Sequence, residues 1–178
     1  MPPEILRPDA SEYATFYTRY IRSVPDGDLL SHLRDNGREL ERVLRPLSEE
    51  RAAFRYAEGK WSIRDIVGHL IDAERIFAYR ALRMARGDTA PLAGFDENAY
   101  AAASNADARR LADLLEELRS VREASVLLFA SFPADAWLRT GTASGQPVSV
   151  RALAYITLGH AMHHLQVLRE RYGVVAAA

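Results

Sequence analysis

The sequence predicts an all-α fold: a four-helix bundle with long connections and a short N-terminal helical segment. Four segments of roughly 19–25 residues each repeat apolar residues with the 3.6-residue period of an amphipathic helix. No hairpin dipeptide lies between alternating strand-like segments, and a length of 178 residues fits one domain. We therefore expect residues 1–178 to form a single domain whose four helices share one core.

The first two predicted helices cover residues 29–47 and 62–86. In the second, Ser62 and Asp65 have the spacing of a capping box, and Gly87 is the expected stop. The stripe of the first helix consists of Leu29, Leu33, Leu40, Leu44 and Leu47. The stripe of the second consists of Ile63, Ile66, Val67, Leu70, Phe77, Ala78 and Ala81.

The last two predicted helices cover residues 107–131 and 149–172, the latter capped by Ser149 and stopped by Gly173. The links at residues 87–106 and 132–148 are long for a compact domain. A link of that length can cross the bundle and make the second and third helices parallel. Residues 11–21 are rich in aromatic side chains and are expected to form a short extra helix across the bundle.

Composition excludes several classes of function. A net charge of −1 and a pI near 6.5 argue against a nucleic-acid-binding surface. The chain has no cysteine, which excludes disulfides, thiolate metal sites and a cysteine nucleophile. No apolar run approaches the roughly 18 residues of a membrane-spanning helix, and no secretory signal is recognisable. We expect a cytoplasmic protein that binds neither nucleic acid nor membrane.

The most informative polar residues are two histidines on the apolar face of the last predicted helix. His160 and His164 are four residues apart, so their Cβ atoms lie about 5–6 Å apart and both imidazoles can bind one cation. The spacing leaves two interpretations open: a metal pair, or two buried neutral imidazoles bonded to their neighbours. Ala161 occupies the glutamate position of the zinc-protease HExxH motif, which argues against a metalloprotease.

A third ligand would favour the metal, and His69 in the second predicted helix is the candidate. It lies off the centre of that helix's stripe, so a surface position is the simpler interpretation of this residue alone. His32, at the edge of the first stripe, has no further support. Asp72 follows His69 by three residues and could hold a ligand imidazole in its orientation.

Two charged residues lie at the centres of apolar stripes, Glu74 in the second predicted helix and Arg122 in the third. A buried carboxylate needs a partner, so the simplest interpretation is that they form a buried ion pair. Glu74 and Asp72 are also the candidates for a catalytic carboxylate. Trp61 and Trp137 flank helix ends, where each could form the wall of a substrate or cofactor pocket.

Two stretches are similar to the DinB-like superfamily. Residues 60–75 (KWSIRDIVGHLIDAER) resemble the histidine-bearing second helix of that family, and residues 159–166 (GHAMHHLQ) look like its last helix. The resemblance spans about residues 28–172 and includes residues 91–96 and 136–142. It implies a metal-binding four-helix bundle with up-down-down-up connectivity, often a homodimer.

By position, this resemblance implies a metal site formed by His69, His160 and His164, with His163 as a neighbour that does not bind the metal. Zn or Ni is the expected divalent metal, with Fe, Co or Mn as alternatives. Family members with known activity are thiol-dependent transferases and isomerases that use mycothiol, bacillithiol or glutathione. Arg80 and Arg151 are then candidates for holding the carboxylates of a thiol cosubstrate.

Three hypotheses follow for the function. The first is transfer of a low-molecular-weight thiol to an electrophilic small molecule at a three-histidine metal site. The second is metal-dependent hydrolysis, with the metal activating water. The third is a non-catalytic stress-response bundle that binds a metal or ligand. Thiol-dependent turnover separates the first two.

Overall fold

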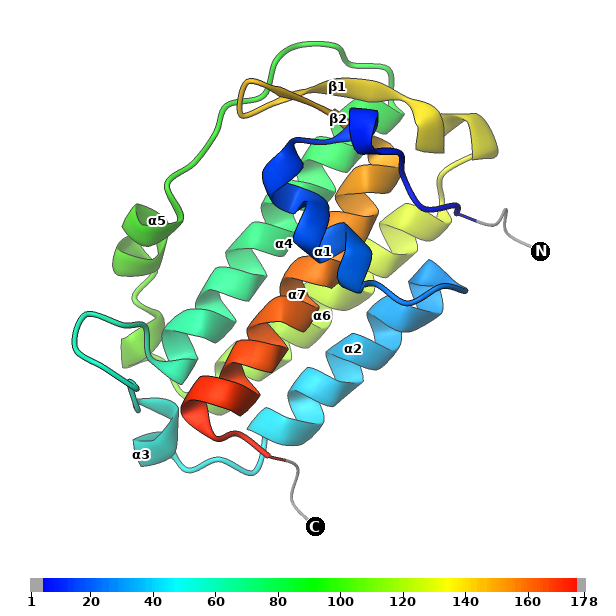
Figure 1. Ribbon diagram of the computed structural model, residues 1–178. Helices are drawn as coiled ribbons and strands as arrows, with labels where there is room; N and C mark the ends of the chain where they lie inside the picture. The colour runs from blue at the N-terminus through cyan, green and yellow to red at the C-terminus, as the bar shows by residue number, and fades with distance from the viewer. Residues whose placement is uncertain (1–4, 176–178) are drawn as a thin grey trace.

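Four long helices run along one axis in the computed structural model, which describes residues 5–175 (Figure 1). They are α2 (Leu29–Leu44), α4 (Ile63–Ala85), α6 (Leu111–Ala130) and α7 (Val150–Tyr172). α4 packs against α6 and α7, and α2 closes the other side against the same two helices. The predicted four-helix bundle is therefore confirmed.

The helices follow the up-down-down-up order. In Figure 1, α2 and α7 run in one direction, whereas α4 and α6 run in the other. The two neighbours α4 and α6 are parallel because the link at residues 87–106 returns the chain to the end at which α4 began. This link contains the short helix α5 (Glu97–Ala103) on the outside of the bundle.

Capping residues fix the helix ends close to their predicted positions. At the start of α4, Ser62 Oγ accepts from the Asp65 backbone N–H at 3.0 Å, and Asp65 Oδ2 accepts from the Ser62 N–H at 2.9 Å. This is the predicted capping box. At the start of α7, Ser149 Oγ accepts from the Ala152 backbone N–H at 3.0 Å, and Gly173, with a φ of 63°, ends the helix.

Two predicted boundaries were too generous. α2 ends at Leu44 because Pro46 has no backbone N–H with which to continue the helical hydrogen bonds, and Ser48 starts the short helix α3 (Glu49–Ala52). α6 begins at Leu111 and not at Asp107. Asp107 lies instead in a 3₁₀ turn at Ala106–Ala108, where its carboxylate accepts from Ser62 Oγ at 2.6 Å.

A β-hairpin, β1 (Thr140–Ala143) and β2 (Gln146–Ser149), covers one end of the bundle (Figure 1). The expectation of no hairpin was wrong. Ser144 and Gly145 both have positive φ, 53° and 74°, which is the geometry of a two-residue type I′ turn. The strands are four residues long and the turn begins with serine in place of asparagine or aspartate, so the usual sequence signal is weak.

The N-terminal segment crosses the bundle on the outer side of α7, as expected. It consists of two 3₁₀ turns (Ala10–Glu12 and Thr15–Tyr17) followed by α1 (Thr18–Ser23). α1 approaches α7 so closely that a Cβ atom at Gly159 would collide with the backbone carbonyl of Tyr20. Gly159 is therefore required for this close approach of two backbones.

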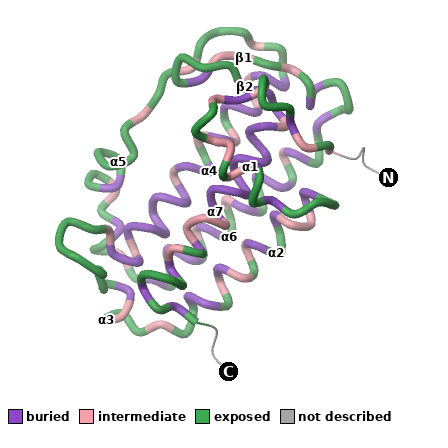
Figure 2. Tube along the Cα trace, viewed as in Figure 1, coloured by how far each residue is buried: buried purple, intermediate pink, exposed green. Residues whose placement is uncertain are grey.

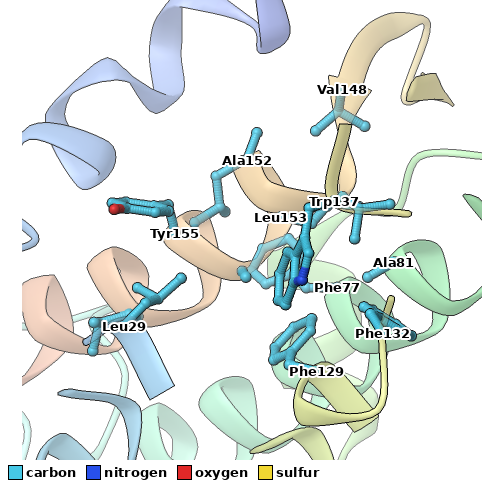
Figure 3. Close-up of a cluster of buried hydrophobic side chains, with 14 of the residues drawn as sticks. Leu29, Phe77, Ala81, Phe129, Phe132, Trp137, Val148, Ala152, Leu153 and Tyr155 are labelled. Atoms are coloured by element: carbon cyan, nitrogen blue, oxygen red, sulfur yellow. The ribbon is translucent and has the colours of Figure 1, made fainter. Parts of the chain in front are cut away.

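A polar layer divides the core into two apolar clusters. One cluster, shown in Figure 3, contains Phe129, Phe132 and Trp137 near the hairpin; the other lies toward the α3 end. Along each helix, the change from one cluster to the other falls at or beside a buried polar residue: Asn36, Glu74, Arg122 and His160. Figure 2 shows the buried inner faces of the four helices.

Among the described residues, every helix is too short or too polar to cross a bilayer.

Candidate metal centre

Three imidazoles meet between α4 and α7. His69 comes from α4, and His160 and His164 come from successive turns of α7. One ring nitrogen from each lies within 4.8 Å of the others, and the Nε2 atoms of His69 and His160 are 2.9 Å apart. The structure therefore brings together the three residues that the sequence singled out.

His69 points into the bundle although it lies off the centre of the apolar stripe of α4. Its side chain is only 4% exposed. α4 contacts both α6 and α7, so its buried arc is wider than the stripe of strongly apolar residues. The imidazole occupies the part of that arc which faces α7.

Aromatic side chains surround the cluster. The Trp61 ring lies 4.8 Å from the His69 ring and stacks on His164 at 6.4 Å between centroids. Tyr20 from α1 and Phe77 from α4 place their rings edge-on to His160 at 5.6 and 5.7 Å. Sequence reasoning suggested Trp61 but missed Tyr20, because the aromatic N-terminal segment gave no indication of which helix it would cover.

Burial keeps the three imidazoles neutral. Loss of solvent lowers the pKa of His69 to about 4 and that of His164 to about 3, and it lowers the pKa of His160 well below its usual value. The neighbouring imidazoles add to the effect at His160 and His164. Neutral imidazole is the form that binds a metal, so the ligands need not lose a proton first.

These residues fit a divalent cation. Nδ1 of His164 is buried and has no hydrogen-bond partner, so the protein alone does not satisfy the polar atoms of the cluster. Three neutral nitrogen donors are a common set for zinc and for other late transition metals. Such a set leaves further coordination positions open, as in catalytic rather than structural sites.

The two other histidines lie outside the cluster. His163 is half-buried beside Tyr20, with 5.5 Å between the ring centroids, on the face of α7 that α1 covers. Its expected role as a neighbour that does not bind metal fits this position. His32 lies 3.0 Å from the Asp26 carbonyl through Nε2, at the start of α2.

Glu74 and Arg122 form the predicted buried ion pair. Arg122 donates from Nε and Nη2 to the Glu74 carboxylate at 2.8–3.0 Å. Its Nη1 donates to the Leu33 carbonyl at 2.7 Å and to Asn36 Oδ1 at 3.2 Å. The guanidinium therefore ties α6 to α4 and α2, and Glu74 is fully engaged in this pair.

Asp72 faces α6. Its charged neighbours are Arg75, Glu117 and Arg109, and burial raises the pKa of its carboxyl. Among residues 5–175, no hydrogen bond joins Asp72 or Glu74 to any of the three imidazoles. Neither carboxylate therefore holds a clustered imidazole in its orientation by a hydrogen bond, and the catalytic role suggested for Asp72 and Glu74 stays a prediction.

Three of the four candidates for holding a substrate or cofactor lie toward the hairpin end of the bundle. Arg80 donates to the Ala93 carbonyl at 2.8 Å and to Ser144 Oγ at 3.1 Å, anchoring the long link to the hairpin. Arg151 is bonded to Glu12, with 2.8 Å between Nε and Oε2. Trp137 is buried in the apolar cluster of Figure 3. Arg80 is eleven residues along α4 from His69, about 16 Å of helix.

The depressed pKa values predict how acid acts on the metal-free protein. The histidines of the unfolded chain are protonated below about pH 6.5, whereas in the folded chain the imidazoles of His69 and His164 stay neutral down to about pH 4 and pH 3. The free energy of unfolding therefore decreases as the pH is lowered through this range. Between pH 7 and pH 5 we expect a loss of about 2–4 kcal/mol from His69 and His164 together, since one pKa unit is worth about 1.4 kcal/mol. Urea unfolding at both pH values measures it, and His69→Gln should reduce the loss. Equal stability at the two pH values would contradict the burial argument.

The fold and the sequence both have known counterparts. The YfiT protein of Bacillus subtilis, described as a probable metal-dependent hydrolase with an unusual four-helix bundle topology, superposes with a TM-score of 0.73. The two are 16% identical, and the match covers 85% of this chain and 94% of YfiT. No curated protein sequence matches the chain significantly. The family model of the DinB superfamily matches residues 32–168, which include all three clustered histidines and most of the bundle. The chain therefore belongs to the DinB superfamily.

Proposed function

We propose that the chain is a metal-dependent enzyme that transfers a low-molecular-weight thiol to an electrophilic small molecule. His69, His160 and His164 would hold one divalent cation. The observation that carries this proposal is the convergence of three neutral imidazoles, two of them buried and one half-buried, in a chain without cysteine. Such a protein supplies a metal site but no thiolate, so the nucleophile has to come from solution.

The protein's own residues then have defined tasks. Bound at three imidazoles, a divalent cation lowers the pKa of a thiol or a water molecule that occupies an open position. The histidines fix the cation between α4 and α7. Trp61, Tyr20 and Phe77 exclude bulk water from the imidazoles, and this strengthens every electrostatic interaction inside the site.

Within residues 5–175, no carboxylate is hydrogen-bonded to any of the three clustered imidazoles, and this supports thiol transfer over hydrolysis. Glu74 is bonded to Arg122, Asp72 faces α6, and Asp65 is bonded to Ser62 and Arg55. A thiol loses its proton near pH 8.5, whereas water needs about pH 15.7, so a thiol depends far less on a general base.

Hydrolysis is the second candidate, and the similarity to YfiT favours it because YfiT is described as a probable metal-dependent hydrolase. In that case the metal alone would have to make water nucleophilic. A non-catalytic metal- or ligand-binding bundle is the third. The proposal also includes a homodimer in the cytoplasm, which light scattering and cell fractionation would test.

One set of assays separates these candidates. Metal is measured by plasma mass spectrometry on wild type, His160→Ala and the neighbouring control His163→Ala. We expect about one divalent metal per chain, lost only in His160→Ala. The zinc-loaded wild type should then accelerate the reaction of glutathione or cysteine with 1-chloro-2,4-dinitrobenzene. Acceleration of 4-nitrophenyl acetate hydrolysis without added thiol would favour the hydrolase, and metal without either activity would favour the non-catalytic bundle.

A further inference from the structure

A small cavity lies against one of the three imidazoles. Its volume is about 240 Å³, and His164 forms part of its wall together with Trp61. The remaining wall is largely apolar or aromatic: Tyr56, Ile66, Val167 and Tyr172. The Tyr56 and Tyr172 rings meet edge to face at 5.1 Å, and the Tyr172 hydroxyl donates to the Trp61 carbonyl at 2.6 Å. The aromatic wall is therefore held in place by its own contacts.

Lys60 carries the only formal charge on this wall. It is also the only lysine in the chain. Its backbone carbonyl accepts from Arg55 Nη1 at 2.8 Å, which fixes the loop that carries it. Within residues 5–175, the Lys60 ammonium has no ion pair or hydrogen bond, and neither does the side-chain amide of Asn98, which lines the same cavity.

A neighbouring cavity contains a second cation, and its state differs from that of Lys60. This neighbouring cavity has a volume of about 430 Å³ and shares Gly59, Lys60, Trp61 and Asn98 with the first, so the two cavities adjoin each other. Its other cation, Arg55, is already bonded to Asp65 at 2.7 Å and to Asp107 at 2.5 Å. Lys60 is thus the cation in this region that remains free to pair with an incoming anion.

We propose that this cavity binds a small monocarboxylate with an apolar or aromatic body, and that Lys60, assisted by Asn98, holds the carboxylate. The apolar body would contact Trp61, Tyr56 and Tyr172, next to His164. The inference rests on the proposed function and adds the substrate class: the electrophile that accepts the thiol is an anionic small molecule. Lys60 would be a specificity-determining residue at the rim and not part of the metal site.

The test compares benzoate with its neutral analogue benzamide as probes. Trp61 lies on the cavity wall, whereas Trp137 is buried in the distant cluster, so tryptophan fluorescence reports on binding. Because Lys60 is exposed, we expect a modest preference for benzoate of about three- to fivefold, which should weaken with added salt. Lys60→Met should abolish the preference, and Lys60→Arg should retain it.

Arg34→Gln is the matched control. Arg34 is an exposed cation that has no ion pair in the part of the chain the structure describes. It lines a different cavity, between α2 and α6, so its substitution should leave the preference unchanged. No benzoate preference in the wild type, or a preference that survives Lys60→Met, would overturn the inference.

The metal content of the same samples reports separately on the proposed function. One metal per chain without a benzoate preference would leave the proposed function standing, and absence of metal would refute the proposed function whatever the probes do.

Discussion

Replacing Arg122 with methionine should lower the free energy of unfolding by about 3–5 kcal/mol, because it leaves the Glu74 carboxylate buried without a partner. Both side chains are almost fully buried, at 6% and 4% exposure. The substitution also removes the donors to the Leu33 carbonyl and to Asn36. Urea unfolding followed by circular dichroism measures the loss, if the variant remains folded at low denaturant.

The double variant Glu74→Leu/Arg122→Met separates an unpaired charge from lost packing. Removing both partners leaves no unpaired charge, so we expect it to recover most of the stability that Arg122→Met loses. Arg119, in the same helix, forms an ion pair with exposed Glu116, and Arg119→Met should change stability little. If Arg122→Met were as mild as Arg119→Met, the ion pair would not be the strong constraint on the polar layer that we infer.

Zinc should raise the melting temperature of the chelator-treated protein by about 5–10 °C when the free metal is about 100 times its dissociation constant. That concentration ratio stabilises the folded state by about 2.7 kcal/mol, and each kcal/mol is worth about 2–4 °C in a domain of this size. His160 supplies the nitrogen 2.9 Å from that of His69. His160→Ala should therefore abolish the zinc response, measured by scanning calorimetry.

His163→Ala is the control for zinc binding at other histidines. His163 lies three residues from His160 on the same helix and outside the three-histidine cluster, so this variant should keep the full shift. An equal shift in His160→Ala would mean that zinc binds elsewhere on the chain. Nickel and cobalt, tested in the same way, would show which divalent ions the three nitrogens accept.

Periodicity was sufficient to predict the four helices, because each buries one predominantly apolar face. Local capping residues mark the starts of α2, α4 and α7, whereas the start of α6 has no side-chain cap of its own. The same logic predicted the Glu74–Arg122 pair, since two opposite charges at stripe centres have few other ways to be satisfied. The hairpin was missed because its strands are only four residues long. Tertiary packing, which local patterns do not contain, decided its formation: the Leu92 N–H bonds to the Thr142 carbonyl, and the Ser144 N–H bonds to the Leu92 carbonyl.

The candidate site was predictable in its ligands and less so in its surroundings. The i, i+4 spacing of His160 and His164 requires only one helix, so sequence alone suffices to place them together. His69 depended on which neighbour α4 would face, and the resemblance to the family supplied what the helix pattern did not. The buried positions of Arg80 and Trp137 depend on the hairpin and the long link, so missing the hairpin also hid their surroundings.

The ligands also lie far apart along the chain, and this separation affects how the site is made. His69 and His160 are 91 residues apart, so the three nitrogens come together only when the last helix docks onto the second helix of the bundle. During synthesis, α4 leaves the ribosome long before α7 exists, and a metal ion then finds only one of its ligands. Contacts between such distant residues form late and slowly. Metal loading is therefore expected to follow folding. The bound ion would hold α7 against α4 and slow the detachment of the C-terminal helix from the bundle.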